Sequence, residues 1–370
     1  MGIRRGLDNP GCSIVSQPFI IDLIGSVSSP PHSTFHAKME TMVASDIQQK
    51  TTGESPVLTS PGSRLRWYLY VAPLIVLPIL LLVFAIVVVP TEWFAEHSGD
   101  PFLLTLGYGA LLHNADCKIV IYGDSTAMIG VNPDLIAQRT GLTTCNIAET
   151  EGMSMVNGTM VLDRYLENNP RPRVLMFFYA PEDLDPQSQR RNTYVTTFEA
   201  VTWRFRQPHP LLSLVALMRH PDDFFSWAIH GARWAMDSIH AKPLPPETRL
   251  QRFKTHGQSF IKDPVMENCT LVPPPAAPDR AWVAGLRSKY AAPGSTVLVD
   301  AMTMPDCDPG IEYYKRELAG LIDNQINTLP ANDFHAGGRH VTRAGSIPLS
   351  EEIADQVLKR LKAEHRTGVQ

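Results

Sequence analysis

The feature that most limits how this chain can fold is a run of 23 residues without a charge, from Trp67 to Val89. About 20 helical residues cross the apolar core of a bilayer, and soluble helices of this length are rarely so uniformly apolar. Pro73 and Pro78 fall inside the run, and membrane helices tolerate such kinks. We therefore predict one transmembrane helix over residues 67–89, with a buried core helix as the alternative.

The charges on either side of this run predict its orientation. Arg64 and Arg66 precede it, whereas no Lys or Arg follows it until Lys118. Because basic residues favour the cytoplasmic side, we expect the N-terminus inside and the large C-terminal part in the periplasm or outside. The run is too long and too far from Met1 for an ordinary cleaved signal, so we expect a single-pass signal-anchor in the inner (cytoplasmic) membrane.

Residues 1–62 are rich in Ser, Thr, Pro and Gly and show no sustained hydrophobic period. This composition predicts a disordered cytoplasmic segment, because such a chain buries too little apolar surface to fold. A true start at Met39 or Met42 stays open.

Charge and histidine spacing exclude two kinds of function. A net charge of −4 gives no general attraction to nucleic acid, which needs a concentrated basic surface. Three histidines recur every ten residues and would point in different directions on a helix, namely His220, His230 and His240. We therefore expect no metal site, and the absence of a P-loop motif leaves no cofactor to expect.

Four of the five cysteines follow the predicted membrane helix, and only Cys12 precedes it. An even number in an oxidising compartment favours disulfides. Cys117 stands just before one predicted strand and Cys145 at the start of the next, so parallel neighbouring strands would bring both sulfurs to the same sheet edge. This predicts Cys117–Cys145 together with Cys269–Cys307; the alternative is four unpaired buried cysteines.

Strand and helix patterns alternate after the membrane run. Short apolar, β-branched segments predict strands over 118–122, 143–148, 174–179 and 296–301, with helices over 132–138, 152–167, 281–290 and 346–361. This order predicts an α/β domain over residues 110–365 with a parallel sheet. Residues 185–278 interrupt the alternation as a helical insertion, whose aromatic-rich part spans 211–240.

A candidate nucleophile follows the first predicted strand in the turn Gly123-Asp124-Ser125. Ligands bind at the carboxyl ends of strands in an open parallel sheet, which is where Ser125 would lie. Its own N–H, near a helix start, would stabilise an oxyanion. A serine hydroxyl is a weak nucleophile alone, so a base must come from elsewhere in the chain. The alternative is an ordinary loop serine.

The candidate base lies near the C-terminus, in the stretch from Asp333 to Gly345. We expect His340 to be the base because it directly precedes the turn before the last helix. His335 is the second choice, and Asp333 is the expected orienting carboxylate. The alternative for either histidine is a surface loop residue.

The Gly123-Asp124-Ser125 turn and the stretch His340-Val-Thr-Arg-Ala-Gly345 together resemble the SGNH, or GDSL, hydrolases. The resemblance covers about residues 117–184 and 295–364. It implies a three-layer α/β/α fold, Ser125 as nucleophile and His340 as base. It also implies an oxyanion hole from the Ser125 N–H, a glycine N–H after the second strand and a side-chain amide after the third. Gly152 fits the glycine position, with Asn157-Gly158 as a weaker choice.

The sequence departs from this family at two positions. Gly337 stands where the family has an aspartate three residues before its histidine, and Asp333 lies seven residues before His340. The amide is replaced by Ala180-Pro181-Glu182-Asp183, and an ionised carboxylate would repel an oxyanion. Losing one such donor costs on the order of 10²–10³ in rate. Glu182 and Asp183, with Asp124, are therefore candidates for binding substrate, for example a sugar hydroxyl.

The resemblance implies serine-dependent acyl transfer or ester hydrolysis outside the cytoplasm. Single-pass anchored members of this family are often polysaccharide O-acetylation proteins that work beside a multi-span acyltransferase. We therefore expect a cell-surface carbohydrate substrate and such a membrane partner. The alternative is a non-catalytic assembly or carbohydrate-binding subunit on an eroded SGNH fold.

Overall fold

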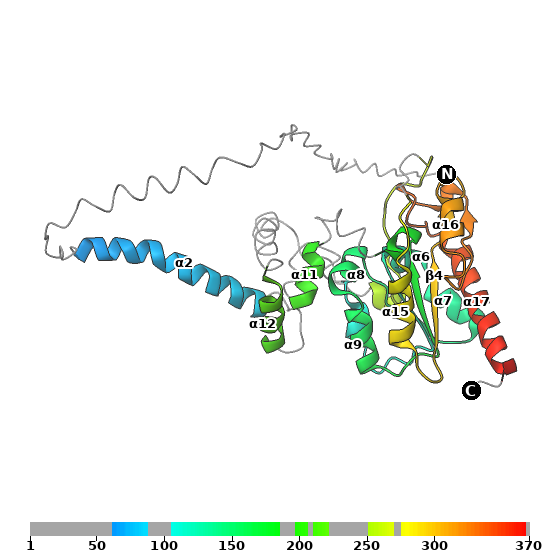
Figure 1. The fold of residues 1–370 in the computed structure, drawn as a ribbon, viewed down its shortest axis with the longest axis horizontal. Helices are drawn as coiled ribbons and strands as arrows, with labels where there is room; N and C mark the ends of the chain where they lie inside the picture. Colours follow the sequence, from blue (N-terminus) through cyan, green and yellow to red (C-terminus); the bar gives the residue numbers. More distant parts are fainter. Residues whose placement is uncertain are drawn as a thin grey trace, which may run out of the picture. The chain divides into compact units, whose positions relative to one another are not determined.

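The structure is a computed structural model that describes residues 61–87, 105–185, 197–205, 210–221, 251–269 and 275–367 (Figure 1). The segment predicted to be disordered lies outside these residues except for its last two, 61 and 62. The predicted aromatic helix over 211–240 lies outside them beyond residue 221.

Helix α2 (Pro61–Val87) has 27 residues and contains Pro73 and Pro78. Across the residues and side chains that the structure describes, no helix combines the length and the apolar composition of a membrane span. The anchor over residues 67–89 therefore remains a prediction of the sequence, and residues 88 and 89 lie outside the described part.

A four-stranded sheet forms the centre of the α/β unit, with all its strands parallel and in the order β2-β1-β3-β4. The strands are β1 (Ile119–Gly123), β2 (Thr144–Asn146), β3 (Val174–Tyr179) and β4 (Thr296–Ala301). The parallel sheet predicted from the sequence is confirmed. β2 ends sooner than predicted, although the Ile147 N–H still donates to Ile121 O at 2.8 Å.

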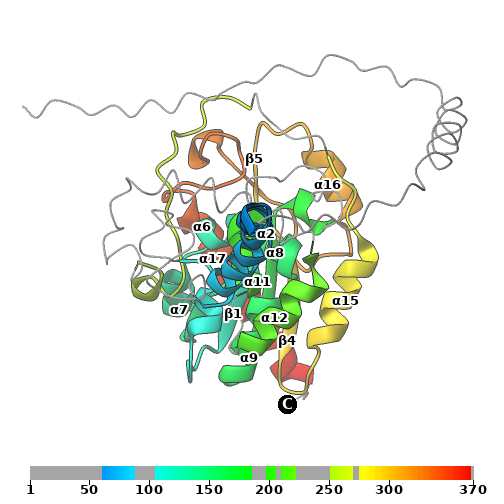
Figure 2. The same cartoon turned by 90° about the vertical axis from the view of Figure 1, so that its left-hand side faces the viewer.

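Alternate side chains of the strands enter two separate cores, because successive residues of a strand point to opposite faces. Tyr122 and Phe177 belong to one core, and Ile121 and Met176 to the other. Helices cover both faces, which gives three layers (Figures 1 and 2). The first core is closed by α8 (Glu151–Asn157), α9 (Met160–Asn168) and α15 (Arg280–Tyr290), and the second by α6 (Ser125–Gly130), α7 (Pro133–Thr140) and α17 (Ser346–Thr367).

Local capping residues set the limits of the helices. Asn132 Oδ1 accepts the Asp134 N–H at 3.0 Å at the start of α7, and Gly141 ends the helix in the left-handed region at φ 71°. The single helix predicted over 152–167 is wrong. Gly158 adopts φ 57° and divides it into α8 and α9, a conformation that glycine adopts at little cost.

Smaller elements complete the described chain. They are α5 (Tyr108–Leu111), η1 (Pro181–Leu184), α11 (Thr197–Phe205), α12 (Pro210–Arg219), α16 (Ile311–Glu317) and η2 (Ala331–Asp333), with a separate pair of parallel strands, β5 (Met304–Pro305) and β6 (Thr328–Leu329). Of these, α11 and α12 belong to the helical insertion expected between residues 185 and 278.

One described part of the insertion, residues 251–269, is built into the α/β unit. The Asn146 N–H at the edge strand donates to His256 O at 2.9 Å, and the Ser259 N–H donates to Met128 O at 2.9 Å. Arg252 is fully buried and donates to Ala148 O at 2.6 Å. The sequence places this segment in an insertion, but the structure makes it part of the packed domain.

The structure contains both disulfides expected from the sequence, each with its Cα atoms 5.8 Å apart. Cys117–Cys145 joins the chain before β1 to β2, as the parallel-neighbour argument predicts. Cys269–Cys307 joins the end of the segment 251–269 to the chain just after β5.

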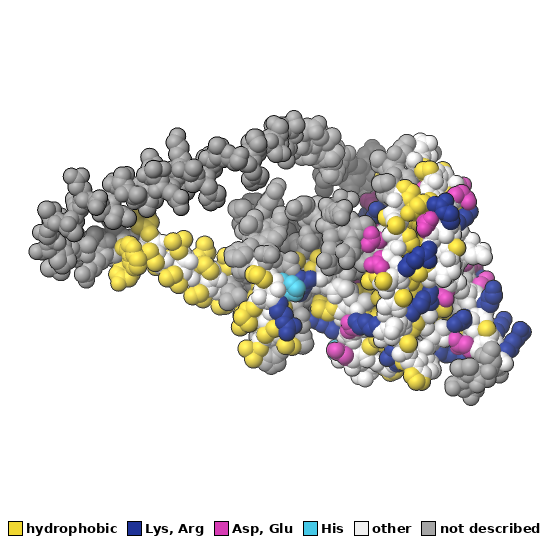
Figure 3. Space-filling model, viewed as in Figure 1, with side chains coloured by type: hydrophobic (Ala, Val, Ile, Leu, Met, Phe, Trp, Pro, Cys, Tyr) yellow, Lys and Arg dark blue, Asp and Glu magenta, His cyan; other side chains and the backbone are white. Residues whose placement is uncertain are grey.

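Basic and acidic side chains are interspersed on the face of the α/β unit that Figure 3 shows. Ion pairs such as Arg287–Asp323 and Lys289–Asp163, at 2.5 and 2.8 Å, bring the two signs together. The described part of this face therefore mixes the two signs of charge.

Candidate active site

The candidate nucleophile lies at the carboxyl end of the central strands. Ser125 is the first residue of α6, directly after β1, and Asp124 caps the helix by accepting the Thr126 N–H at 2.8 Å. A side chain at Gly123 would overlap Phe178 O of β3, so only glycine fits the close approach of β1 and β3 there. β1 connects to β2 on one side and β3 lies on the other, which makes this point a topological switch, the usual ligand position in such sheets.

The tertiary structure brings a histidine to this serine across 215 residues of sequence. Ser125 Oγ lies 2.9 Å from His340 Nε2, within hydrogen-bond distance. Burial lowers the pKa of His340 from its ordinary 6.5, against the opposing charges of Asp124 and Asp263. The imidazole is therefore neutral at neutral pH, which is the form that accepts a proton.

The other histidine considered from the sequence has a structural role. His335 Nδ1 lies 2.8 Å from Asp263 O, and the His335 N–H donates to His340 O at 2.8 Å. These two contacts fix the loop that carries His340. Among the hydrogen bonds of the described residues, none joins His335 to Ser125.

The structure does not bring Asp333 to the imidazole of His340. The Asp333 carbonyl accepts the Thr342 N–H at 2.7 Å, and no hydrogen bond among the described residues links its carboxylate to His340. The carboxylates that favour the charged imidazole are Asp124 and Asp263. Asp263 belongs to the segment 251–269, and the sequence around it carries no motif that identifies it.

Two of the oxyanion candidates are separated by the structure. Gly152 is buried in the first turn of α8, after β2, where the resemblance places a glycine N–H. Asn157 lies at the far end of the same helix. Its Nδ2 donates to Ala200 O at 2.8 Å, and its Oδ1 accepts from Arg204 Nε at 3.3 Å. Both hydrogen bonds of its side-chain amide therefore go to residues of α11.

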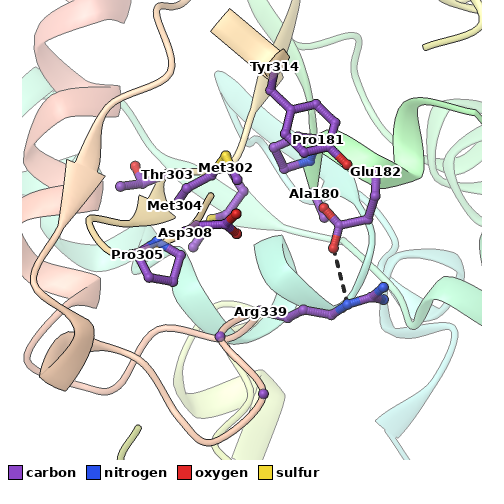
Figure 4. A pocket seen from close by; sticks show the side chains of 12 residues that line it. Ala180, Pro181, Glu182, Met302, Thr303, Met304, Pro305, Asp308, Tyr314 and Arg339 are labelled. Carbon is purple, nitrogen blue, oxygen red and sulfur yellow. Dashed lines mark ion pairs between the residues drawn. The ribbon is translucent and has the colours of Figure 1, made fainter. Parts of the chain in front are cut away.

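An arginine that the sequence reasoning did not single out joins three parts of the site. Arg339, the residue before His340, lies 3.3 Å from Glu151 Oε2 at the start of α8 and 3.1 Å from Glu182 Oε1 in η1 (Figure 4). Burial raises the pKa of both carboxyl groups, and the charge of Arg339 opposes the rise. Through these two ion pairs, Arg339 holds the loop that carries His340 close to the segments that follow β2 and β3.

Asp183 is the more deeply buried of the two carboxyl groups in η1. Its residue is 7% exposed, and its Oδ1 has no hydrogen-bond partner among the described residues. Burial raises the pKa of Asp183 well above 3.8, and the neighbouring charges of Asp124, Glu151 and Glu182 raise it further.

A small pocket, partly open to solvent, is lined by Arg339, the residue before His340, and by residues that follow β3 and β4; Ser125 and His340 are not among its lining residues. Glu182 and Arg339 form an ion pair in its lining, and Asp308 also lines it (Figure 4). Its other lining residues are mostly apolar, namely Ala180, Pro181, Met302, Met304, Pro305 and Tyr314, with Thr303, Gly337 and Gly338. Among the described side chains, no cluster of His, Cys, Asp and Glu is arranged to hold a metal ion.

Comparison with known families, characterised proteins and solved structures returned no match.

The candidate site contains a serine hydroxyl, a neutral histidine within hydrogen-bond distance, and a pocket with carboxylates and one arginine. The sequence indicates Ser125 and His340 through their positions after a strand and before a helix. Glu151 and Arg339 adjoin predicted site residues, but only the fold shows that they form ion pairs.

Proposed function

We propose that this protein is an SGNH-like serine enzyme that transfers or hydrolyses an acyl ester on a carbohydrate. The observation that carries the proposal is the 2.9 Å contact between Ser125 Oγ and His340 Nε2 at the carboxyl end of β1. A neutral histidine bonded to a serine at a ligand-binding sheet edge is the arrangement that nucleophilic catalysis requires.

The reaction begins when Ser125 Oγ attacks the carbonyl carbon of the ester and His340 Nε2 takes the hydroxyl proton. His340 then gives this proton to the leaving alcohol, and an acyl-serine remains. If water attacks the acyl-serine, the enzyme is an esterase. If a sugar hydroxyl attacks it, the enzyme is an O-acyltransferase. In both cases His340 takes the proton of the attacking oxygen and returns it to Ser125.

The charges around His340 support the base role. Proton transfer makes the imidazole positive, and the nearby carboxylates of Asp124 and Asp263 favour that form. The Ser125 N–H, at the first position of α6, has no partner within the helix and is available to the oxyanion. Gly152 supplies the second candidate N–H.

The pocket lined by Arg339, the neighbour of His340 in the chain, supports a carbohydrate ester as substrate. Glu182 and Asp308 offer carboxylate oxygens, which accept hydrogen bonds from sugar hydroxyls, and Thr303 can both donate and accept. The apolar side chains of Met302 and Met304 line the same space and suit a short acyl chain.

We further propose that the α/β unit works outside the cytoplasm, held by the predicted anchor over residues 67–89. Two disulfides support an oxidising compartment. We also propose that a multi-span acyltransferase supplies the acyl groups, and this part of the proposal rests on the family resemblance alone.

Labelling with a fluorophosphonate tests the nucleophile. The full-length chain, purified with detergent present, should form an adduct on Ser125, and Ser125→Ala should abolish it. Ser288→Ala, an exposed serine on α15, is the matched control and should label like the wild-type chain. Turnover is then measured with p-nitrophenyl acetate and with an acetylated polysaccharide.

The competing function is a carbohydrate-binding or assembly subunit without turnover. Two observations support it: no described carboxylate forms a hydrogen bond with His340, and carboxyl groups stand at the place of an amide after β3. Equal labelling of the wild-type chain and Ser125→Ala, with retained polysaccharide binding, would establish this function instead.

A further inference from the structure

The loop that carries His340 is a short hairpin over residues 334–341. Phe334 and Val341 form an isolated antiparallel bridge, and both are buried in the second core, so they anchor the base of the hairpin. The His335 N–H donates to His340 O at 2.8 Å and joins the two sides of the tip. The tip itself lies outside the core, so its place depends on the segments beside it.

The segment 263–269 lies along one side of this hairpin. The Met266 N–H donates to Phe334 O at 2.8 Å, and the Ala336 N–H donates to Pro264 O at 2.7 Å. These two bonds continue the antiparallel pairing of the hairpin into the segment. A displacement of the segment would break them and release the tip.

Strand β5 lies on the other side of the tip. Gly338 adopts φ 71°, and a Cβ at this position would lie 3.4 Å from Met266 Sδ and 3.5 Å from Pro305 Cγ. Pro305 belongs to β5 and lines the pocket (Figure 4). The tip of the hairpin is therefore enclosed between the segment 263–269 and β5.

The disulfide Cys269–Cys307 joins these two flanking segments. Cys269 follows Met266 by three residues, and Cys307 follows Pro305 by two. Residues 262–265 are exposed, so apolar burial contributes little to holding that part of the segment. The disulfide is thus the covalent link that keeps the segment beside the hairpin.

We propose that the Cys269–Cys307 disulfide positions His340 against Ser125, and that its reduction lowers the activity of the site. The catalytic part of this inference rests on the proposed function, whereas the attachment of the hairpin does not. Both cysteines act through the segment and the hairpin rather than on the reacting atoms, so they are positioning residues. The distance that they maintain is the 2.9 Å between Ser125 Oγ and His340 Nε2.

Exposure makes this disulfide the reducible one of the two. Cys307 is exposed and Cys269 is partly exposed, whereas Cys117 and Cys145 are 6% and 5% exposed. A dithiol reductant attacks one cysteine sulfur through a thiolate, and its second thiol then releases the mixed disulfide. The S–S bond breaks, the two cysteines become thiols, and the reductant leaves as a disulfide.

The second disulfide provides a matched control for the test. The two bridges close stretches of 38 and 28 residues, so their removal relaxes the unfolded chain to a similar degree. Fluorophosphonate labelling of the full-length chain in detergent should slow on the order of tenfold to a hundredfold in Cys269→Ser/Cys307→Ser, because the base is displaced. Cys117→Ser/Cys145→Ser, at the amino end of β1, should label at the wild-type rate.

The pH profile separates positioning from a loss of folded protein. Burial lowers the pKa of His340, and the groups whose charges act on it are Asp124, Asp263, Arg339 and His335. A released hairpin exposes the imidazole to water, so the midpoint of labelling in Cys269→Ser/Cys307→Ser should move up towards the ordinary value of 6.5. A smaller folded fraction alone would lower the amplitude of labelling and leave the midpoint where it is.

Hydrogen–deuterium exchange tests the attachment without any activity. Amides of residues 334–342 should exchange faster in Cys269→Ser/Cys307→Ser than in the wild-type chain, and no faster in the control variant. Dithiothreitol added to the folded wild-type chain should reproduce the faster exchange and the slower labelling, and reoxidation should reverse both.

Three outcomes have distinct meanings. Unchanged exchange over residues 334–342, or equal loss of labelling in both double variants, overturns the inference. Wild-type labelling that persists with an unchanged midpoint after selective reduction of Cys269–Cys307 also overturns it. Absence of labelling in a wild-type chain whose hairpin responds to the disulfide overturns the proposed function and leaves the attachment established.

Discussion

At the scale of single residues, the site depends on His340 being neutral and close to Ser125. Its position was indicated by the sequence, but its protonation state was not, because burial sets it. The carboxylate that assists the imidazole also differs from the expected Asp333. Asp263 and Asp124 act through space, and Asp263 is exposed, so salt will screen its contribution.

Removing the base gives the first residue-scale prediction. His340→Ala should reduce the rate of fluorophosphonate labelling by on the order of 10²–10⁴. Because burial lowers the pKa of His340, the rise of wild-type labelling with pH should have its midpoint below 6.5. Stopped labelling reactions across a pH series measure both quantities.

His335→Ala is the matched control for this prediction. It removes the bond to Asp263 O but leaves the contact between Ser125 and His340, so labelling should change by a few-fold at most. A larger loss in His335→Ala than in His340→Ala would reassign the base to His335.

At the scale of elements, the site depends on the close approach of β1 and β3. Gly123 and Phe178 are register partners, and the carbonyl of Phe178 occupies the space where a Cβ of residue 123 would lie. The same two strand ends carry Ser125 and the η1 carboxyl groups. Any change that separates the strands will therefore affect both fold and site.

Gly123→Ala should destabilise the protein by more than about 3 kcal/mol, because the overlap is with backbone rather than with a movable side chain. Gly285→Ala is the control, since Gly285 lies in α15 with nothing within 4 Å of an added Cβ. It should stabilise by roughly 0.5–1 kcal/mol by improving helix propensity. Denaturant unfolding of both variants measures the difference, and equal stabilities would contradict the predicted overlap.

At the scale of the whole α/β unit, a buried ion pair joins the segment 251–269 to the sheet. Arg252 Nη1 lies 3.4 Å from Glu149 Oε1, and both side chains are almost completely buried. The same carboxylate accepts the Gly107 N–H at 2.9 Å, so the pair also fixes the chain before α5. Burial raises the pKa of Glu149 to about 7, with the charge of Arg252 opposing the rise.

Arg252→Met should destabilise the protein by about 3–5 kcal/mol, because it leaves Glu149 buried without a cation. When the pKa of a carboxyl group is higher in the folded than in the unfolded protein, the free energy of unfolding falls as the pH rises from the unfolded-state pKa through the folded-state pKa. The loss in Arg252→Met should therefore be greater above neutral pH than below it. Denaturant unfolding at two pH values measures this effect.

The double variant Arg252→Met/Glu149→Gln separates charge from packing in this prediction. Replacing the carboxyl group removes the unpaired charge, so the double variant should recover most of the stability and lose the added pH dependence. If it is as unstable as Arg252→Met, packing of the arginine rather than its charge holds the segment.

The sequence by itself determined the parallel sheet, predicted the two disulfides that the structure contains, and indicated Ser125 and His340 as the centre of the candidate site. These follow from local signals, since buried strands, capping residues such as Asn132 and a Gly-Asp-Ser turn each reflect nearby sequence. Only the tertiary structure decided which charges meet around the site. Arg339, Glu151, Asp183 and Asp263 come from separate segments, and their pairing and protonation depend on distances and burial that local sequence does not encode.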